Sequence, residues 1–451
     1  MNIQEHFKKG KKEETVKAII KEAKECNKQY NFFNTITENL AVRQIKTAKG
    51  KLAGLPISVK DNICVQGVES TAGSAILTGY KPIFNATVIQ KLMNEGAAII
   101  GKTSQDEFGF GSFNVNIGLD KKIPKNPHDP TRVTGGSSGG SAGFTAYTKH
   151  PHVAIAESTG GSISCPAAFC GVAGLTPTYG LVSRYGLIDY ANSLDKIGII
   201  AKKVSEIQPV LDIIKGHDEK DPTSLKQEIQ KFKQVKKVAL VKEAFKNQPL
   251  LKKQLIEKLN ELQIKYEEIS LPVTEKYSLQ TYYIIAMAEA STNLAKYCGM
   301  RYGYEEAVKD SYDSYFTKIR SKRFNKESKR RIILGTFARM AGYRDQYYLK
   351  AMQVRTLIIE EYKKAFKKDD VIITPTMPCI APKFSEVNKL TPLQHYQMDI
   401  LTVGPNLAGL PHLSVPFTLQ ENMPLAVQII GDHLTEYTIL NLGEQIERSS
   451  K

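Results

Sequence analysis

The sequence is poor in the features that mark membrane, secreted and zinc-binding proteins. No apolar run approaches the about 18 residues of a membrane span, and the lysine-rich segment 1–12 lacks the apolar core of a signal peptide. Only 6 cysteines occur among the 451 residues, at positions 26, 64, 165, 170, 298 and 379. None of them forms a Cys-x-x-Cys pair. We therefore expect reduced thiols, no structural metal site, no membrane association and a cytoplasmic location.

Acidic residues are also scarce relative to basic ones. The chain has 62 Lys and Arg against 46 Asp and Glu, which gives a formal net charge of +16. This excess favours an anionic partner such as nucleic acid, although a lysine-rich proteome would explain it equally well. Hydrophobic residues make up 41% of the chain, enough for a large core, so a disordered protein is excluded.

Short apolar runs alternate with amphipathic segments, which predicts an α/β protein whose core is a large mixed β-sheet. Strands are expected at 57–60, 97–100, 153–156, 238–241, 264–269, 371–374, 413–416 and 425–430. Helices are expected at 85–95, 250–262, 277–298 and 326–366, and from about residue 435. We interpret 1–451 as a single domain, with 1–50 as a helical segment packed on it and 217–275 as a candidate peripheral α/β lobe.

Two familiar motifs match the sequence but not its context. Residues 96–103 fit the phosphate-binding pattern G-x-x-x-x-G-K-[ST], yet the expected order is helix and then strand, the reverse of what a phosphate loop needs. Residues 135–139 fit the nucleophile elbow G-x-S-x-G, but the preceding segment contains Pro127 and Pro130, which argue against the required strand. We expect neither an ATP site nor a Ser-His-Asp hydrolase.

Three separate segments together carry a more specific signal. They are Val59-Lys60-Asp61-Asn62, Gly135-Gly-Ser-Ser-Gly-Gly-Ser-Ala, and Ser158-Thr-Gly-Gly-Ser-Ile-Ser164. Together with the segments 102–108, 126–127, 166–175, 179–187 and 193–195, they resemble the amidase signature family. The resemblance implies the fold of that family, a mixed sheet covered by helices on both faces, and the hydrolysis of amides by a Ser-Ser-Lys triad.

The resemblance also assigns the chemical roles. Lys60 would be the base, Ser137 would relay the proton, and Ser162 would attack the amide. Lysine can be a base only when it is uncharged, and burial at the end of an apolar strand would favour that form. The relay serine of this family follows a cis peptide bond, here Gly136–Ser137. The backbone N–H groups of Thr159, Gly160, Gly161 and Ser162 would form the oxyanion hole.

The chain departs from the family pattern around the nucleophile. The usual Gly-Thr-Asp-Thr before the two glycines is Ala156-Glu157-Ser158-Thr159, and the usual Arg-Gln after the nucleophile is Ser164-Cys165. These changes remove a carboxylate and a guanidinium that brace the loop in the family. The triad positions are intact, so we expect activity, with Ser164 as the weaker alternative nucleophile.

The C-terminal half resembles one branch of the family, the A subunits of glutamyl-tRNA(Gln) amidotransferases. The similar segments include 281–286, 289–295, 301–304, 329–336, 398–402 and 405–411. In that branch the matching positions bind glutamine. Arg331 would hold the α-carboxylate, with Arg330 as its rival, Asp399 the ammonium and Tyr282 the polar end of the substrate.

The resemblance implies a glutaminase subunit that supplies ammonia for converting Glu-tRNA(Gln) to Gln-tRNA(Gln). Its partners would be the B and C subunits, with tRNA(Gln) contacted mainly through the complex. No cofactor or metal is expected in this chain, because ATP and Mg²⁺ serve the B subunit in that branch. Two alternatives remain at this stage: a stand-alone amidase of broad specificity, and a weakly active scaffold subunit with the same fold.

Overall fold

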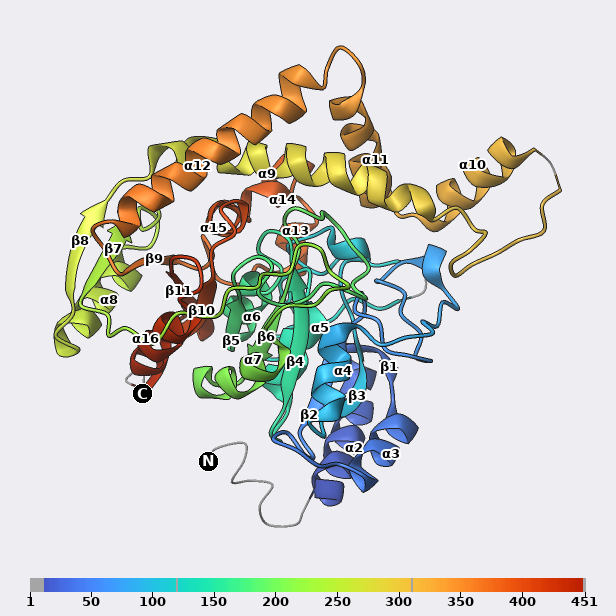
Figure 1. Ribbon diagram of the computed structural model, residues 1–451, viewed down its shortest axis with the longest axis horizontal. Coiled ribbons are helices and arrows are strands. Elements are labelled where there is room, and N and C mark those ends of the chain that lie inside the picture. Colours follow the sequence, from blue (N-terminus) through green and yellow to red (C-terminus); the bar gives the residue numbers. More distant parts are fainter. Residues whose placement is uncertain (1–11, 119–120, 310, 449–451) are drawn as a thin grey trace.

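An 11-stranded sheet forms the centre of the computed structural model, which describes residues 12–118, 121–309 and 311–448 (Figure 1). The strand order is β1-β3-β2-β4-β6-β5-β10-β11-β9-β7-β8, with both parallel and antiparallel pairs. The predicted mixed sheet is therefore confirmed. The strands are β1 (Phe33–Ile36), β2 (Pro56–Lys60), β3 (Ala98–Thr103), β4 (Val153–Ser158), β5 (Ala173–Thr176), β6 (Lys196–Ala201), β7 (Lys237–Val241), β8 (Lys265–Ile269), β9 (Val371–Pro375), β10 (His412–Gln420) and β11 (Met423–Ile430).

Helices cover both faces of this sheet, as predicted. Strand β4 shows why, because its alternate side chains enter different apolar clusters. Val153 and Ile155 join the cluster under α4 (Thr87–Asn94), α7 (Gln208–Ile214) and α16 (Glu436–Arg448), whereas Ala154 and Ala156 face α5 (Gly139–Tyr147) and α6 (Ser164–Cys170). The small alanines leave room for the glycine-rich helix α5 to lie close to the sheet.

The C-terminal half adds a layer of long helices along one side of the molecule (Figure 1). Helix α9 packs against both α11 and α12. The helices of this half are α8 (Pro249–Glu261), α9 (Pro272–Asn293), α10 (Tyr312–Arg323), α11 (Lys326–Arg339), α12 (Lys350–Phe366), α13 (Phe384–Val387), α14 (Pro392–Gln397) and α15 (Val403–Leu407). The expected long helical stretch 326–366 is wrong as one unit, because α11 ends at Arg339 and Gly342 has a positive φ of 87°.

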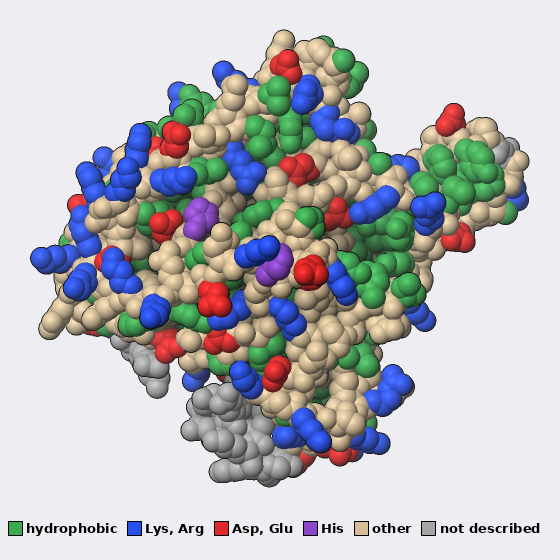
Figure 2. Space-filling model, viewed as in Figure 1, with side chains coloured by type: hydrophobic (Ala, Val, Ile, Leu, Met, Phe, Trp, Pro, Cys, Tyr) green, Lys and Arg blue, Asp and Glu red, His purple; other side chains and the backbone are tan. Residues whose placement is uncertain are grey.

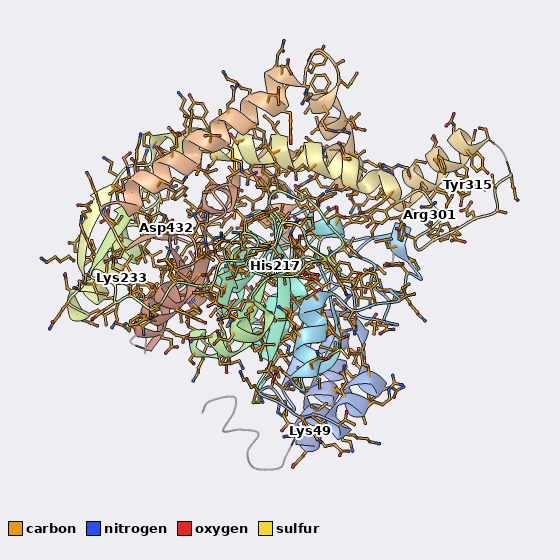
Figure 3. The ribbon with its side chains drawn as sticks, viewed as in Figure 1. Lys49, His217, Lys233, Arg301, Tyr315 and Asp432 are labelled. Atoms are coloured by element: carbon orange, nitrogen blue, oxygen red, sulfur yellow. The ribbon has the colours of Figure 1, made fainter. Side chains whose placement is uncertain are left out.

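Helix α10 belongs to an arm that projects from this layer (Figure 3). Within the arm, the Tyr315 hydroxyl donates to the carbonyl of Gly299 at 2.6 Å. Helices α2 (Lys12–Tyr30) and α3 (Glu38–Lys46) lie at the opposite end, where Val16, Ile19, Ile20 and Ala23 are buried as predicted. The first part of the expected segment 1–50, residues 1–11, lies outside the described residues.

The segment 217–275 completes one edge of the same sheet. Its strands β7 and β8 are parallel to each other, and β7 also pairs with β9, while α8 connects β7 to β8. Leu251, Leu255 and Leu259 of α8 join the cluster that contains Val238 and Leu240 of β7. This segment therefore shares a core with the rest of the chain.

The arrangement of β2 and β4 decides where the polar signature residues meet. The two strands are parallel neighbours, with Val59 aligned to Ile155. Since parallel strands end at the same edge, Lys60 at the end of β2 lies close to Glu157 and Ser158 at the end of β4. The Ser137 and Ser162 loops approach this edge because α5 and α6 begin just after them.

The surface carries its basic residues without concentrating them in one place on the face shown in Figure 2. Lysine and arginine side chains are spread over this face and are interspersed with acidic ones. Among the described residues, no helix has both the length and the apolar composition needed to cross a bilayer. All 6 cysteines are free thiols.

Candidate active site

Lys60 is fully buried, with 0% of its surface exposed. The apolar residues beside it in sequence, Ile57, Val59 and Ile63, belong to the main core cluster, as expected. Its amine is nevertheless surrounded by polar partners. Lys60 Nζ lies 2.7 Å from Ser137 Oγ, 2.8 Å from Glu157 Oε2 and 2.9 Å from the Glu157 carbonyl oxygen. The amine therefore contacts the predicted relay serine directly, and both side chains are fully buried.

Ser137 lies in the loop just before α5, and the Gly136–Ser137 peptide bond is cis, as predicted. The Ser137 carbonyl accepts a hydrogen bond from the Asp106 N–H at 3.2 Å. The next residue, Ser138, donates its N–H to the carbonyl of Ser162 at 3.3 Å. These bonds hold the relay serine between the lysine and the loop that carries the predicted nucleophile.

Ser162 follows the two glycines in the turn between β4 and α6, and 7% of its surface is exposed. Both glycines are required by close packing. A Cβ at Gly160 would lie 2.8 Å from the Tyr282 hydroxyl oxygen, and one at Gly161 would overlap Thr402 Oγ1. Within the described residues, the N–H groups of Gly160, Gly161 and Ser162 donate to no protein acceptor. They are available for the oxyanion role assigned to them.

The loop is braced by contacts that the sequence did not reveal. The side-chain amide of Asn406 donates to the carbonyl of Thr159. The Thr159 hydroxyl lies 2.7 Å from Glu157 Oε1 and 2.8 Å from Asp195 Oδ1. The loss of the family's aspartate at Ser158 is thus accompanied by a carboxylate one residue earlier, at Glu157. A carboxylate therefore still contacts this loop, from Glu157 rather than from position 158.

Of the two candidate arginines, Arg330 and Arg331, Arg331 is the buried one, with 3% of its surface exposed. Its Nε donates to Glu327 Oε1 at 2.8 Å and its Nη1 to the Tyr190 hydroxyl at 2.6 Å. Four aromatic rings surround the guanidinium at 5.0 to 5.7 Å: Phe110, Tyr190, Tyr283 and Tyr396. Arg330 is more exposed and pairs with the same Glu327 carboxylate.

Asp399 is buried near Arg331 and the four aromatic rings around it, which together form a cage. Its two carboxylate oxygens accept hydrogen bonds from Ser112 Oγ at 2.7 Å and from the Tyr283 hydroxyl at 2.6 Å. Burial raises the pKa of the Asp399 carboxyl, and these two hydrogen bonds oppose the shift. Tyr282 is also buried and lies over Gly160, so it joins the substrate side of the site to the glycine loop.

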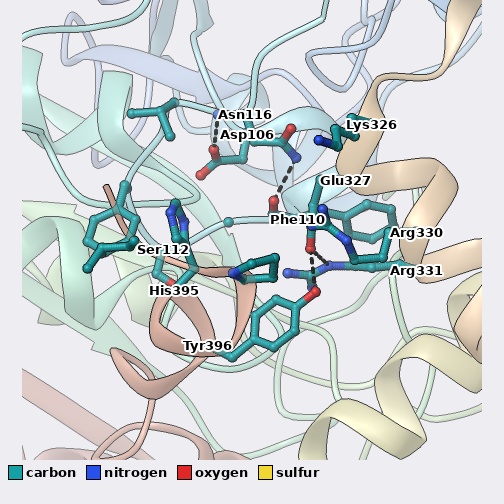
Figure 4. A pocket seen from close by; sticks show the side chains of 15 residues that line it. Asp106, Phe110, Ser112, Asn116, Lys326, Glu327, Arg330, Arg331, His395 and Tyr396 are labelled. Atoms are coloured by element: carbon teal, nitrogen blue, oxygen red, sulfur yellow. Dashed lines mark hydrogen bonds and ion pairs between the residues drawn. The ribbon is translucent and has the colours of Figure 1, made fainter. Parts of the chain in front are cut away.

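A cavity of about 340 Å³ opens beside the cage (Figure 4). Its lining includes Asp106, Ser112, Glu327, Arg330 and Arg331, and the dashed lines mark the bonds that tie Glu327 to Arg331 and Tyr396. Ser162, Tyr282 and Asp399 do not line it. Asp106 links the cavity to the triad, since its N–H donates to the Ser137 carbonyl.

Asp106 and Glu327 are polar residues of this site that the sequence patterns did not single out. Burial raises the pKa of Asp106 to about 7, although the N–H groups of Asn116 and Asn114 donate to its carboxylate. Glu327 lies four residues before Arg331, one turn along α11, a spacing typical of helical ion pairs. That spacing was the available sequence signal for Glu327.

The rejected motifs have structural roles. Residues 98–103 form β3 after α4, so the helix does precede the strand as expected. Lys102 is buried, and its amine donates to the Ile63 carbonyl and to Ser70 Oγ, both at 2.7 Å. Ser137 of the elbow pattern faces Lys60.

Ser164, the alternative nucleophile, is completely buried at the start of α6. In the described part of the chain, no group of three His, Cys, Asp or Glu is placed to hold a metal.

Comparisons with known proteins agree with one another. The family model described as Amidase matches residues 14–440. The chain is 46% identical over 402 residues to the A subunit of glutamyl-tRNA(Gln) amidotransferase from Archaeoglobus fulgidus, covering 88% of this chain and 86% of that protein. It is 44% identical to the same subunit of Methanosarcina barkeri, covering 96% of both. The solved structure of the same subunit from Thermotoga maritima superposes with a TM-score of 0.84 at 35% identity, covering 100% of this chain and 95% of that one.

Proposed function

This chain belongs to the amidase family, and we propose that it is the glutamine-hydrolysing A subunit of a glutamyl-tRNA(Gln) amidotransferase. The observation that carries the proposal is the contact of 2.7 Å between Lys60 Nζ and Ser137 Oγ, in a fully buried site beside the Ser162 loop. The similarity to known A subunits over nearly the whole chain supports the choice of this branch of the family.

The proposed reaction begins with attack of Ser162 Oγ on the side-chain carboxamide of glutamine. Ser137 and Lys60 take up the proton of Ser162 in turn and return it to the leaving nitrogen, so ammonia departs and a γ-glutamyl ester remains. The free N–H groups of the 159–162 loop stabilise the negative oxygen of the tetrahedral intermediate. Water then hydrolyses the ester to glutamate by the same proton route.

Recognition of glutamine requires groups that match a zwitterion. In the proposal, Arg331 binds the α-carboxylate. Its Nη2 group is available for this contact, because it donates to no other described residue. Asp399 accepts from the α-ammonium, and Tyr282 hydrogen-bonds the polar end of the substrate. Ser112 and Tyr283 each donate one hydrogen bond to a different oxygen of Asp399, and the remaining lone pairs of the carboxylate can accept from the ammonium. The cavity of about 340 Å³ beside Arg331 is the proposed entry for the amino acid.

The ammonia is used elsewhere in the complex. We propose that glutamate on tRNA(Gln) is amidated by a B subunit with ATP and Mg²⁺, that a C subunit joins the two, and that the complex is cytoplasmic. This chain itself needs no metal or nucleotide in the proposed reaction. Purification of the native complex and its assay for glutamine-dependent conversion of Glu-tRNA(Gln) tests this assignment. Hydrolysis of many simple amides by the chain alone, without co-purifying subunits, would favour a stand-alone amidase.

The Ser162→Ala variant tests the chemistry. We expect glutamine hydrolysis to fall by about 10⁴-fold or more with the fold retained, because removing a triad nucleophile leaves only residual catalysis. Ser164→Ala is the matched control and should keep its activity, since Ser164 is buried in α6. Glutamate release and circular dichroism give the two readouts. Full activity of Ser162→Ala would exclude Ser162 as the nucleophile, and a wild-type rate that stays negligible in the complex would indicate a scaffold subunit.

A further inference from the structure

The amine of Lys60 has an unusual neighbour in this chain. Glu157 is 1% exposed, and its Oε2 lies 2.8 Å from Lys60 Nζ. Glu157 is one of the positions at which this chain departs from the family segment described above, which has threonine there. The same oxygen accepts a second hydrogen bond from the side-chain amide of Asn62 at 3.0 Å. Glu157 is therefore held against Lys60 by a partner other than the lysine itself.

The other oxygen of Glu157, Oε1, shares the Thr159 hydroxyl with Asp195. Together these three groups need one more proton than the hydroxyl supplies. The Thr159 hydroxyl lies within hydrogen-bond distance of Glu157 Oε1 and of Asp195 Oδ1, at 2.7 and 2.8 Å. A hydroxyl has a single proton and can donate to only one of them. For both contacts to be hydrogen bonds, one carboxyl group must carry a proton and donate to the threonine. Burial, and next the negative charge of Glu157, raise the pKa of Asp195 well above its ordinary value.

Lys60 must give up a proton before it can accept one from Ser137. An ammonium group donates three hydrogen bonds, and Lys60 has three acceptors: Ser137 Oγ, Glu157 Oε2 and the Glu157 carbonyl. In that state no lone pair faces Ser137, so lysine alone is not a base. The neighbouring carboxylate can remove the obstacle, because a proton that passes to Glu157 leaves an amine able to accept from Ser137.

We propose that Glu157 is a positioning residue that takes up the proton of Lys60, so that the base of the reaction is a Lys60–Glu157 pair. The inference rests on the function proposed above. As Ser162 Oγ bonds to the carboxamide carbon, the carbonyl π electrons move to oxygen and the Ser162 proton passes to Ser137. The Ser137 proton passes to Lys60, and Lys60 gives one of its own to Glu157. When the C–N bond breaks, the proton returns along this path and leaves with ammonia.

The proposed pair predicts the direction in which the pH dependence of activity shifts when Glu157 is replaced. In the proposed mechanism the pair must hold one proton, and a second proton on it would leave Lys60 with no acceptor for the proton that it gives up. Without the carboxylate, Lys60 must itself lose its proton to water before it can act. Glu157→Gln should therefore move the acidic limb of kcat/KM to higher pH by at least one unit. At pH 7 its activity should be at least tenfold lower, with recovery towards pH 9.

Other charged groups around the pair are the same in the wild type and the variant. Asp61 follows Lys60 and pairs with Lys102 of β3 at 3.7 Å. Asp106 and Arg331 face the site from the loop after β3 and from α11, and Asp195 and Tyr190 from the loop before β6. Arg184 acts on Asp195. A shift between the two profiles thus reports the removal of the Glu157 carboxylate.

The experiment measures two reactions of the full-length chain with its native partners: glutamine hydrolysis, and labelling of Ser162 by a fluorophosphonate followed by intact mass. Both need the same proton removal, but labelling does not need glutamine. Glu361→Gln is the matched control, because Glu361 is a capping carboxylate that accepts from the Val273 and Thr274 N–H groups. Its acidic limb should stay at the wild-type pH.

Glu157→Thr, the residue of the common family segment, provides a second variant without the carboxylate if the glutamine variant does not fold. An upward shift in both reactions supports the inference. An upward shift in labelling alone, with no hydrolysis of glutamine by any form, supports the pair and overturns the proposed substrate. An unchanged limb would show that Glu157 only braces the loop, and a shift to lower pH would show that it only keeps Lys60 charged. Either of these two results overturns the inference.

Discussion

Replacement of Arg331 by lysine tests how the site recognises its substrate. The guanidinium lies among four aromatic rings and makes two directed hydrogen bonds, of 2.8 Å to Glu327 and 2.6 Å to Tyr190. A lysine amine has one nitrogen, so it cannot keep both bonds and also offer a paired donor to a carboxylate. Arg331→Lys should preserve the charge and lose the geometry.

The size of the effect follows from the number of bonds lost. A hydrogen bond to a charged group contributes about 1.5–3 kcal/mol. Loss of one of the two bonds of a bidentate carboxylate contact should therefore lower kcat/KM for glutamine by about 10- to 150-fold. Most of the change should be in KM, because the α-carboxylate takes no part in bond breaking.

The assay compares two substrates. One is glutamine, and the other is 4-aminobutanamide, which is glutamine without its α-carboxylate. Arg331→Lys should lose most of the wild-type preference for glutamine, while its kcat/KM for 4-aminobutanamide should change little. Arg330→Lys is the matched control, since Arg330 is more exposed and contacts the same Glu327 carboxylate. Equal losses for the two substrates, or a larger loss in Arg330→Lys, would refute the assignment of the carboxylate to Arg331.

Two further predictions concern the glycine loop and Asp106. In Gly161→Ala the new Cβ overlaps Thr402 Oγ1, which should lower kcat more than tenfold and the free energy of unfolding by about 1–3 kcal/mol. The double variant with Thr402→Ala should recover part of both losses, and no recovery would contradict the packing argument. The pKa of Asp106 is raised to about 7 by burial, so its stabilising contribution is complete below the unfolded pKa and is lost as the pH rises to about 7. Asp106→Asn should therefore reduce the fall in the free energy of unfolding between about pH 4 and 7 by up to about 4 kcal/mol, as urea titrations can measure. An identical pH dependence in the two proteins would contradict this.

Local patterns in the sequence predicted much of the fold. Apolar runs such as 153–156 and 371–374 became buried strands, and the residues Val16, Ile19, Ile20 and Ala23 became the buried face of a helix. The break between α11 and α12 was missed. Helix α11 ends at Arg339 because Met340 is extended, and the positive φ of Gly342 follows in the turn that leads to the next helix.

The resemblance to a family predicted which residues form the site but not the hydrogen bonds between them. Lys60 and Ser137 lie far apart in the chain and meet at 2.7 Å, as the triad requires. The roles of Ser162 and of the oxyanion loop remain predictions for which the loop geometry leaves room. For Arg331, residue type and spacing could not exclude Arg330, and burial among aromatic rings separates the two.

By itself, the sequence determined most of the strand and helix pattern, the family, and the identity of the signature residues, because these depend on local periodicity and on residue types at short spacing. Strands β1, β5 and β6 were not predicted. Only the tertiary structure decided which polar side chains meet. Glu157 meets Lys60 because β2 and β4 run parallel and end at the same edge of the sheet. Ser112 and Tyr283 meet Asp399 because distant loops and helices close over one buried carboxylate, which no single segment encodes.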